Sequence, residues 1–188
     1  LQFRRARVHF AKVNAIFISH LHGDHCFGLL GLLSTFGLLG RTSKLKVFAP
    51  KDYEDLFKQQ VDFFMQTIEY EIEFVPVDTE QQKVVYQDHS VTVETVPLRH
   101  RLPCCGYIFR EKPTLPHIRR DMIDYYGIPI SQINNIKNGA DWTTEEGDVI
   151  PNSRLVEPAD PPRSYAYCSD TCYLPDLYKR LKDVTVLY

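Results

Sequence analysis

The hexapeptide HLHGDH, which begins at His20, contains three imidazoles and one carboxylate. His20 and His22 are two positions apart, so their side chains point the same way wherever the backbone is extended. Gly23 permits a sharp turn, after which Asp24 and His25 leave the loop in another direction. One short loop therefore offers two pairs of ligands to two metal ions. Neutral imidazole and carboxylate groups are typical zinc ligands, at roughly 2.0–2.2 Å per bond.

A purely structural explanation fits this loop poorly. A single histidine is most often an ordinary surface or core residue, and we expect no more of His9, His89 and His117. Four ligand-type residues in six positions, directly after an apolar segment, form a much more specific pattern. The loop therefore predicts a metal site.

A buried strand must present this loop, and AIFIS at 15–19 has the β-branched and aromatic residues of such a strand. A helix is expected to begin near Asp24, which suits an N-cap, and to continue through CFGLLGLLSTFGLL. Further strands are predicted at 46–49, 71–77, 83–86, 91–96, 165–167 and 184–188, and helices at 52–64 and 175–182. Strands mixed with helices indicate the α/β or α+β class.

The sequence changes in character from Glu111 onward. Prolines and glycines separate two short helical pieces, IRRDMIDYYG and ISQINNIKNG. The stretch 151–163 then contains four prolines and is predicted to be an irregular loop.

HLHGDH matches the HxHxDH signature of the metallo-β-lactamase superfamily. The longer segment FISHLHGDHCFGLLGLLST resembles the ribonuclease Z family, in which a Gly-Leu-rich helix follows the signature. The resemblance covers nearly the whole chain and includes VPLRHRLPCCGYIF, with His100, and YAYCSDTCY, with Asp170. It implies one domain over 1–188, a four-layer αββα sandwich with the site at one edge. The family's first strands and last histidines fall outside 1–188, so we expect a fold incomplete at both termini.

The resemblance also implies how the metals are held. It assigns His20, His22 and His100 to one zinc ion, Asp24 and His25 to the other, and Asp170 to both. Two zinc ions per chain are expected, the second with one histidine fewer than in the family. Asp24 would be the general base or the group that positions water. Zinc lowers the pKa of water from 15.7 to about 7 and neutralises charge on phosphoryl oxygens. Such mixed ligands also admit manganese or iron.

The implied activity is that of a zinc-dependent endoribonuclease, which removes the 3′ trailer from precursor tRNA and leaves a tRNA 3′-hydroxyl. The implied partners are precursor tRNA and a second copy of the chain, as a homodimer. The insertion at about 111–147 corresponds to the arm, or exosite, that grips tRNA in the family. Its basic residues, expected to contact phosphates, are Lys112, Arg119, Arg120 and Lys137.

The arm assignment has an alternative. The family arm carries a Gly-Pro pair after a short Gly-x-Pro turn, whereas this chain keeps only Gly127-Ile128-Pro129. A solvated irregular insertion therefore stays open. So do two other functions: another hydrolase of the same fold, of the phosphodiesterase or arylsulfatase type, and a catalytically impaired RNA-binding relative.

Composition restricts the setting of the protein. The formal net charge of −2 gives no global case for nucleic-acid binding, so any RNA surface must be local. Five irregularly spaced cysteines argue against a secreted disulfide framework and favour a cytoplasmic location. Those nearest the predicted ligands, Cys26, Cys104 and Cys105, are expected to be small buried hydrophobic residues. The longest apolar stretch, 28–40, is too short to span a bilayer, so no membrane association is expected.

Overall fold

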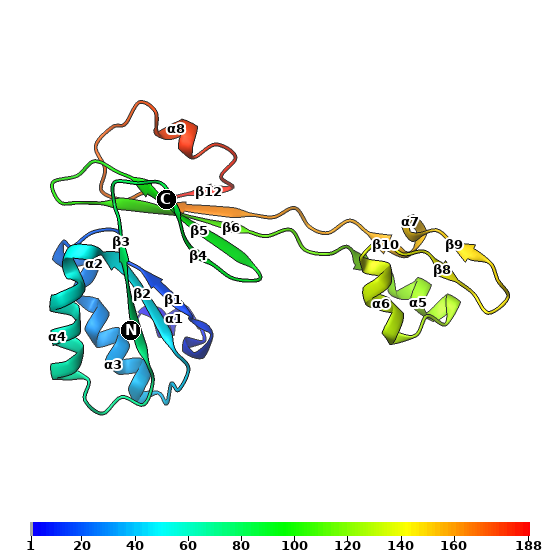
Figure 1. The fold of residues 1–188 in the computed structure, drawn as a ribbon, viewed down its shortest axis with the longest axis horizontal. Helices are drawn as coiled ribbons and strands as arrows, with labels where there is room; N and C mark the ends of the chain where they lie inside the picture. Colours follow the sequence, from blue (N-terminus) through cyan, green and yellow to red (C-terminus); the bar gives the residue numbers. More distant parts are fainter. Residues whose placement is uncertain (1) are drawn as a thin grey trace. The chain divides into compact units, whose positions relative to one another are not determined.

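The structure, a computed structural model, describes residues 2–188 (Figure 1). The described chain divides into two compact units. Unit 1 comprises the residues up to Asp88, 92–109 and 164–188, and unit 2 comprises 89–91 and 110–163. Each unit has a hydrophobic core of its own.

The first sheet of unit 1 is parallel. Its strands run in the order β1-β2-β3, at Ala15–Phe17, Leu45–Pro50 and Ile72–Val77. Parallel neighbours need long crossover connections, which here contain helices α3 (Gly28–Leu38) and α4 (Glu54–Phe64). Both helices lie on one side of the sheet (Figure 1). Leu33, Phe36 and Phe57 of these helices are buried in the core against the strands.

The second sheet of unit 1 has five strands. Their order is β12-β11-β6-β5-β4, at Val186–Leu187, Ser164–Tyr167, Cys105–Glu111, Val91–Pro97 and Val84–Gln87. Along β6, alternate side chains point to opposite faces. Ile108 belongs to a core cluster with Leu177 of helix α8 (Leu177–Arg180). Tyr107 and Phe109 instead contact Phe17 of the first sheet, with ring centroids 5.2 Å apart. The layers are therefore helices, sheet, sheet and helix, and the predicted αββα sandwich is confirmed.

Unit 2 is small and helical. Its helices are α5 (Arg120–Tyr126), α6 (Ile130–Lys137) and α7 (Asn152–Leu155). It also has two short antiparallel strand pairs. Strand β7 (His117–Ile118) pairs with β10 (Val156–Glu157), and β8 (Trp142–Thr143) pairs with β9 (Val149–Ile150). Gly127, with φ of +60°, ends α5 in the left-handed conformation. The backbone N–H of Glu111 donates to the carbonyl oxygen of Arg163 at 2.9 Å, so the two ends of the unit meet.

Some predictions about local structure were wrong. The expected irregular loop at 151–163 contains α7 and β10, because Pro151 occupies a helix N-cap and the other prolines follow Glu157. Asp24 is not an N-cap. Helix α2 (Gly23–Cys26) begins one residue earlier, after His22, and Phe27 separates it from α3.

Three short elements complete the described chain. They are helix α1 (Gln2–Arg5) and the 3-10 turns η1 (Phe10–Lys12) and η2 (Lys51–Tyr53). Among residues 2–188, no helix combines the length and the apolar character that crossing a membrane requires.

Candidate metal centre

The loop that follows β1 is fixed by both sheets of unit 1. The Ile18 N–H donates to the carbonyl oxygen of Phe48 at 2.8 Å. The buried Tyr107 hydroxyl donates to the carbonyl oxygen of Ile18 at 2.9 Å. One residue further, the Cys105 N–H donates to the carbonyl oxygen of Ser19 at 3.1 Å. His20, the next residue, therefore follows a backbone segment that is hydrogen-bonded to both sheets.

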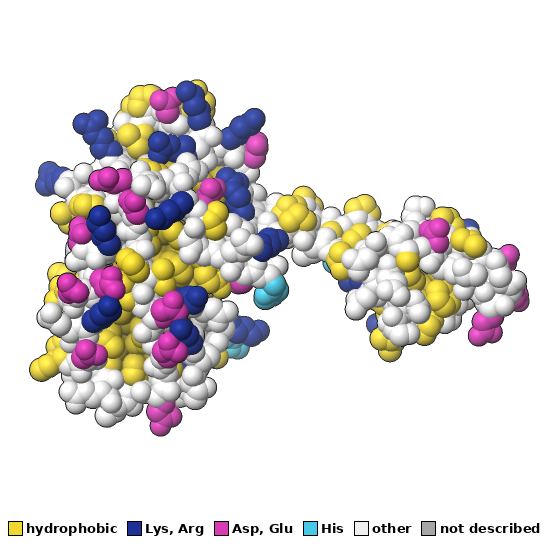
Figure 2. Space-filling view, viewed as in Figure 1, with side chains coloured by type: hydrophobic (Ala, Val, Ile, Leu, Met, Phe, Trp, Pro, Cys, Tyr) yellow, Lys and Arg dark blue, Asp and Glu magenta, His cyan; other side chains and the backbone are white. Residues whose placement is uncertain are grey.

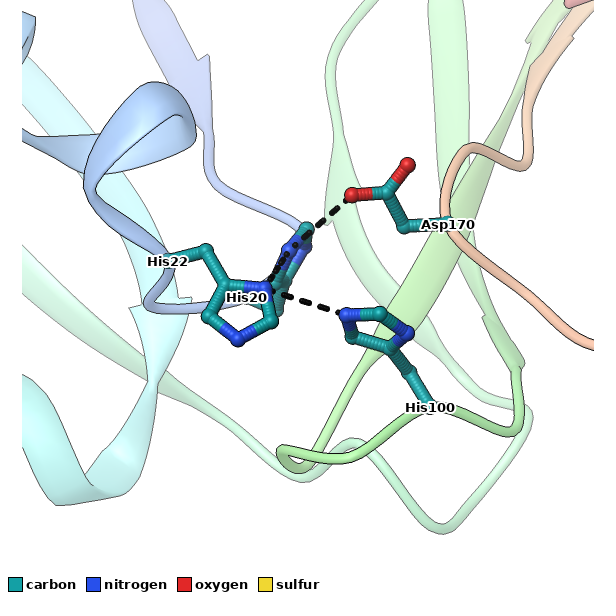
Figure 3. A group of neighbouring side chains, drawn as sticks. All are labelled: His20, His22, His100 and Asp170. Carbon is teal, nitrogen blue, oxygen red and sulfur yellow. Dashed lines mark hydrogen bonds and ion pairs between the residues drawn. The ribbon is translucent and has the colours of Figure 1, made fainter.

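The first donor group consists of His20, His22, His100 and Asp170, which converge in Figure 3. His22 Nδ1 lies 3.1 Å from His20 Nε2 and 3.0 Å from His100 Nε2. His20 Nε2 lies 3.4 Å from Asp170 Oδ2. Two atoms bound to one tetrahedral zinc ion at 2.0–2.1 Å would be about 3.4 Å apart. Both the donor types and their spacing therefore fit a zinc ion.

The second donor group consists of Asp24, His25 and Asp170. His25 Nε2 lies 3.0 Å from Asp170 Oδ2 and 3.4 Å from Asp24 Oδ2. Asp170 thus belongs to both groups. The side chain of Asp24 is 79% exposed, which leaves it the most accessible of the three.

Burial and hydrogen bonding favour the metal-binding protonation states. Burial lowers the pKa of His20, and the neighbouring charge of His25 lowers it further. Ser19 Oγ lies 3.0 Å from His20 Nδ1, and a neutral ring that donates Nδ1–H to it turns the Nε2 lone pair toward the site. Burial opposes ionisation of Asp170, but the Ser169 hydrogen bond and the nearby His25 outweigh it and lower the pKa of Asp170. At these two residues the structure therefore favours a neutral imidazole and an ionised carboxylate.

The segments that carry His100 and Asp170 are tied to each other. The Arg99 N–H donates to Thr171 Oγ1 at 3.2 Å, and the Cys172 N–H donates to the carbonyl oxygen of Arg99 at 2.9 Å. Asp170 itself has φ of +59°, a left-handed conformation that aspartate tolerates better than most residues. This backbone turns the carboxylate toward the histidines.

The structure brings together all six side chains proposed from the sequence as metal ligands. The proposed RNA contacts are dispersed over unit 2: Lys112 precedes β7, Arg119 and Arg120 are at the start of α5, and Lys137 ends α6. Arg119 donates to Asp121 at 2.7 Å, and this hydrogen bond raises the pKa of Arg119. Between 110 and 163 the sequence has seven Lys or Arg and nine Asp or Glu residues. Figure 2 shows acidic side chains at the β8–β9 end, so unit 2 is not basic overall.

Sequence reasoning missed the groups that position the ligands. Ser19 and Tyr107 carry no motif, and the only available signal was that Ser19 directly precedes His20. The predicted burial of Cys26, Cys104 and Cys105 is confirmed, because each is at most 5% exposed. None of these three cysteines belongs to either donor group.

An αββα sandwich whose strand ends carry a cluster of histidines and aspartates defines a metal-binding domain of the metallo-β-lactamase fold. The family described as the β-lactamase superfamily domain matches residues 1–118, and the chain belongs to this superfamily. Within the superfamily its curated relatives carry the name Ribonuclease Z. The relative from Bacteroides fragilis strain ATCC 25285 is 54% identical over 188 residues, and that from Porphyromonas gingivalis strain W83 is 43% identical over 187 residues.

These alignments cover all of this chain and 62% of each relative, so the chain spans about three fifths of their length. Two solved structures share the fold. The short form of human tRNase Z matches with a TM-score of 0.57 at 19% identity, over 99% of this chain and 60% of that one. The metallo-β-lactamase fold protein YhfI from Bacillus subtilis matches with a TM-score of 0.53 at 12% identity, over 99% and 52%.

Proposed function

We propose that this chain carries the metal centre of a zinc-dependent endoribonuclease of the ribonuclease Z type. It would remove the 3′ trailer from precursor tRNA and leave a tRNA 3′-hydroxyl. The observation that carries the proposal is the convergence of two donor groups that share Asp170. The name and 54% identity of the Bacteroides fragilis relative support RNA as the substrate.

Each donor group would hold one zinc ion. The first ion would be held by His20, His22 and His100, and the second by Asp24 and His25. Asp170 would be shared by the two sites. When bound, the ions supply an activated water at neutral pH and neutralise charge on the phosphoryl oxygens. Asp24 would orient that water and accept its proton, because its carboxylate is exposed beside His25. Ser19 would hold His20 in the tautomer that presents Nε2.

Unit 2 would serve as the arm that grips tRNA, with the segment 111–147 at its centre. A compact unit with its own apolar core can present contacts of its own. Lys112, Arg119, Arg120 and Lys137 would contact phosphates, and the acidic balance of the unit limits binding to these few places. The protein would work in the cytoplasm as a homodimer.

The test pairs two substrates with a metal measurement. Purified protein is assayed on a 3′-extended precursor tRNA and on bis-p-nitrophenyl phosphate, and its zinc content is measured by mass spectrometry. We expect two zinc ions per chain and cleavage of both substrates, with a 3′-hydroxyl on the tRNA. Hydrolysis of the small ester without RNA cleavage would point to another hydrolase of this fold. RNA binding without hydrolysis of either substrate would point to an inactive relative.

A further inference from the structure

A cavity of about 310 Å³ lies in unit 1, close in sequence to two of the candidate metal ligands. Its walls come from two segments, 97–99 at the end of β5 and 174–180 around helix α8. Leu98, Leu174 and two prolines give it apolar surface, and the guanidinium groups of Arg99 and Arg180 give it hydrogen-bond donors. None of these residues belongs to either donor group.

The walls of the cavity are formed by the same two segments that carry His100 and Asp170. Arg99 directly precedes His100, and Leu174 follows Asp170 by four residues. The two segments are joined where they leave the ligands, by the hydrogen bonds of Arg99 to Thr171 and Cys172. A strand whose phosphate lies at the metal centre would therefore pass next to this cavity.

Charge determines what the cavity can hold. Its one carboxylate, that of Asp176, is paired with Lys179 at 2.7 Å. Arg180 donates a long bond, 3.4 Å, to the carbonyl oxygen of Pro97, and within residues 2–188 its other guanidinium N–H groups have no hydrogen-bond acceptor, so they can contact a ligand. A guanidinium has five N–H donors in a planar fork that matches the oxygens of a phosphate. The cavity thus combines apolar walls with a positive rim.

We propose that this cavity is a subsite for one nucleotide of the single-stranded RNA segment next to the scissile phosphate. The base would pack against the leucines and prolines, and Arg99 and Arg180 would contact the adjoining phosphate. Proteins that bind single-stranded RNA combine cations along the backbone with side chains that stack on the bases; here leucines and prolines would take the place of the usual aromatic rings. The inference rests on the proposed ribonuclease function and adds a substrate-positioning site to it.

The test compares Arg180→Gln with Lys182→Gln, an exposed lysine two residues further along the chain that does not line the cavity. For Arg180→Gln we expect the KM for a 3′-extended RNA to rise about five- to tenfold, as for the loss of one ordinary hydrogen bond. The slope of log KM against log salt concentration should fall by about 0.7, the value for one phosphate on a single strand. Hydrolysis of bis-p-nitrophenyl phosphate should stay unchanged, and Arg180→Lys should recover part of the RNA KM.

Leu174→Trp tests the apolar wall without touching a charge, and also serves if Arg180→Gln does not fold. It should raise the RNA KM while the salt slope and small-ester hydrolysis stay as in wild type. Equal losses on both substrates, equal effects of Arg180→Gln and Lys182→Gln, or an unchanged RNA KM would overturn the subsite while wild type still cleaves RNA. If wild type hydrolyses only the small ester, the proposed function itself fails and the subsite with it.

Discussion

The candidate metal centre in unit 1 and the basic residues of unit 2 are built differently. The loop that carries His20 is fixed to both sheets by backbone hydrogen bonds and by the buried Tyr107 hydroxyl, and His20 is fully buried. Of the basic residues, Arg120 and Lys137 belong to helices of seven and eight residues that cover a small core. Metal binding needs atoms placed within tenths of an ångström, whereas a phosphate contact tolerates long, mobile side chains. Substitutions in unit 1 should therefore affect every substrate, and those in unit 2 only RNA.

Removing a ligand should give the largest effect. His20→Ala removes one of the ligands of the first donor group. We therefore expect activity on precursor tRNA and on bis-p-nitrophenyl phosphate to fall by more than about a hundredfold. His9→Ala, an exposed histidine of unit 1, is the matched control. Steady-state kinetics with both substrates and zinc content measure the outcome. If His20→Ala kept either activity, the hypothesis that unit 1 supplies the chemistry for both substrates would be contradicted.

Removing a group that orients a ligand should give the next largest effect. Ser19→Ala deletes the hydroxyl 3.0 Å from His20 Nδ1, and losses at such positions are about 10- to 100-fold in metal affinity. Both activities should fall together and recover as zinc is added during titration. Loss of RNA cleavage alone would show that Ser19 acts on the RNA instead of the metal.

Weakening the core of unit 2 should separate the two substrates. Leu155→Ala opens a cavity at a fully buried position, with a cost of about 2–5 kcal/mol. Hydrogen exchange should show faster opening of 110–163, and RNA cleavage should fall about tenfold, since the contacts would lose their support. Small-ester hydrolysis should stay at the wild-type rate. A parallel drop in small-ester hydrolysis would mean that the two units are energetically coupled.

The smallest effect is expected from the arm charges. Arg119→Ala with Arg120→Ala should raise the KM for precursor tRNA a few-fold and reduce its salt dependence, with no change on the small ester. Because Arg119 is already paired with Asp121, Arg120→Ala alone should account for most of the change. Binding measured at several salt concentrations decides this, and equal losses on both substrates would contradict the arm hypothesis.

Sequence patterns predicted best where local periodicity and tertiary structure agree. Strands β2, β3 and β5 lie within about two residues of their predicted positions, because each is a continuous apolar or alternating run. The break at Phe27 could not be seen, since the apolar pattern runs through it without interruption. Strand β6 went unassigned, although it supplies Tyr107 and the centre of the second sheet. Local patterns do not report which strands will pair.

The candidate site divides in a similar way. HLHGDH carries its own information, because its spacing alone places four ligand-type residues around one turn. His100 and Asp170 are single residues in distant loops, and only the family resemblance distinguished them from ordinary turn residues. Their convergence depends on tertiary hydrogen bonds between these loops, and no short-range pattern encodes such bonds.

The hydrogen bond between the Glu111 N–H and the Arg163 carbonyl oxygen bears on how the sequence of unit 2 can evolve. Unit 2 leaves from β6 and returns to β11, which are neighbours in the same sheet. Its ends are therefore already closed by the sheet, and the entropic penalty of a longer loop grows by only about 0.6 kcal/mol per doubling of length. Insertions, deletions or exchange of this segment should thus leave the metal-bearing sandwich intact, so that substrate choice can evolve there independently of the chemistry.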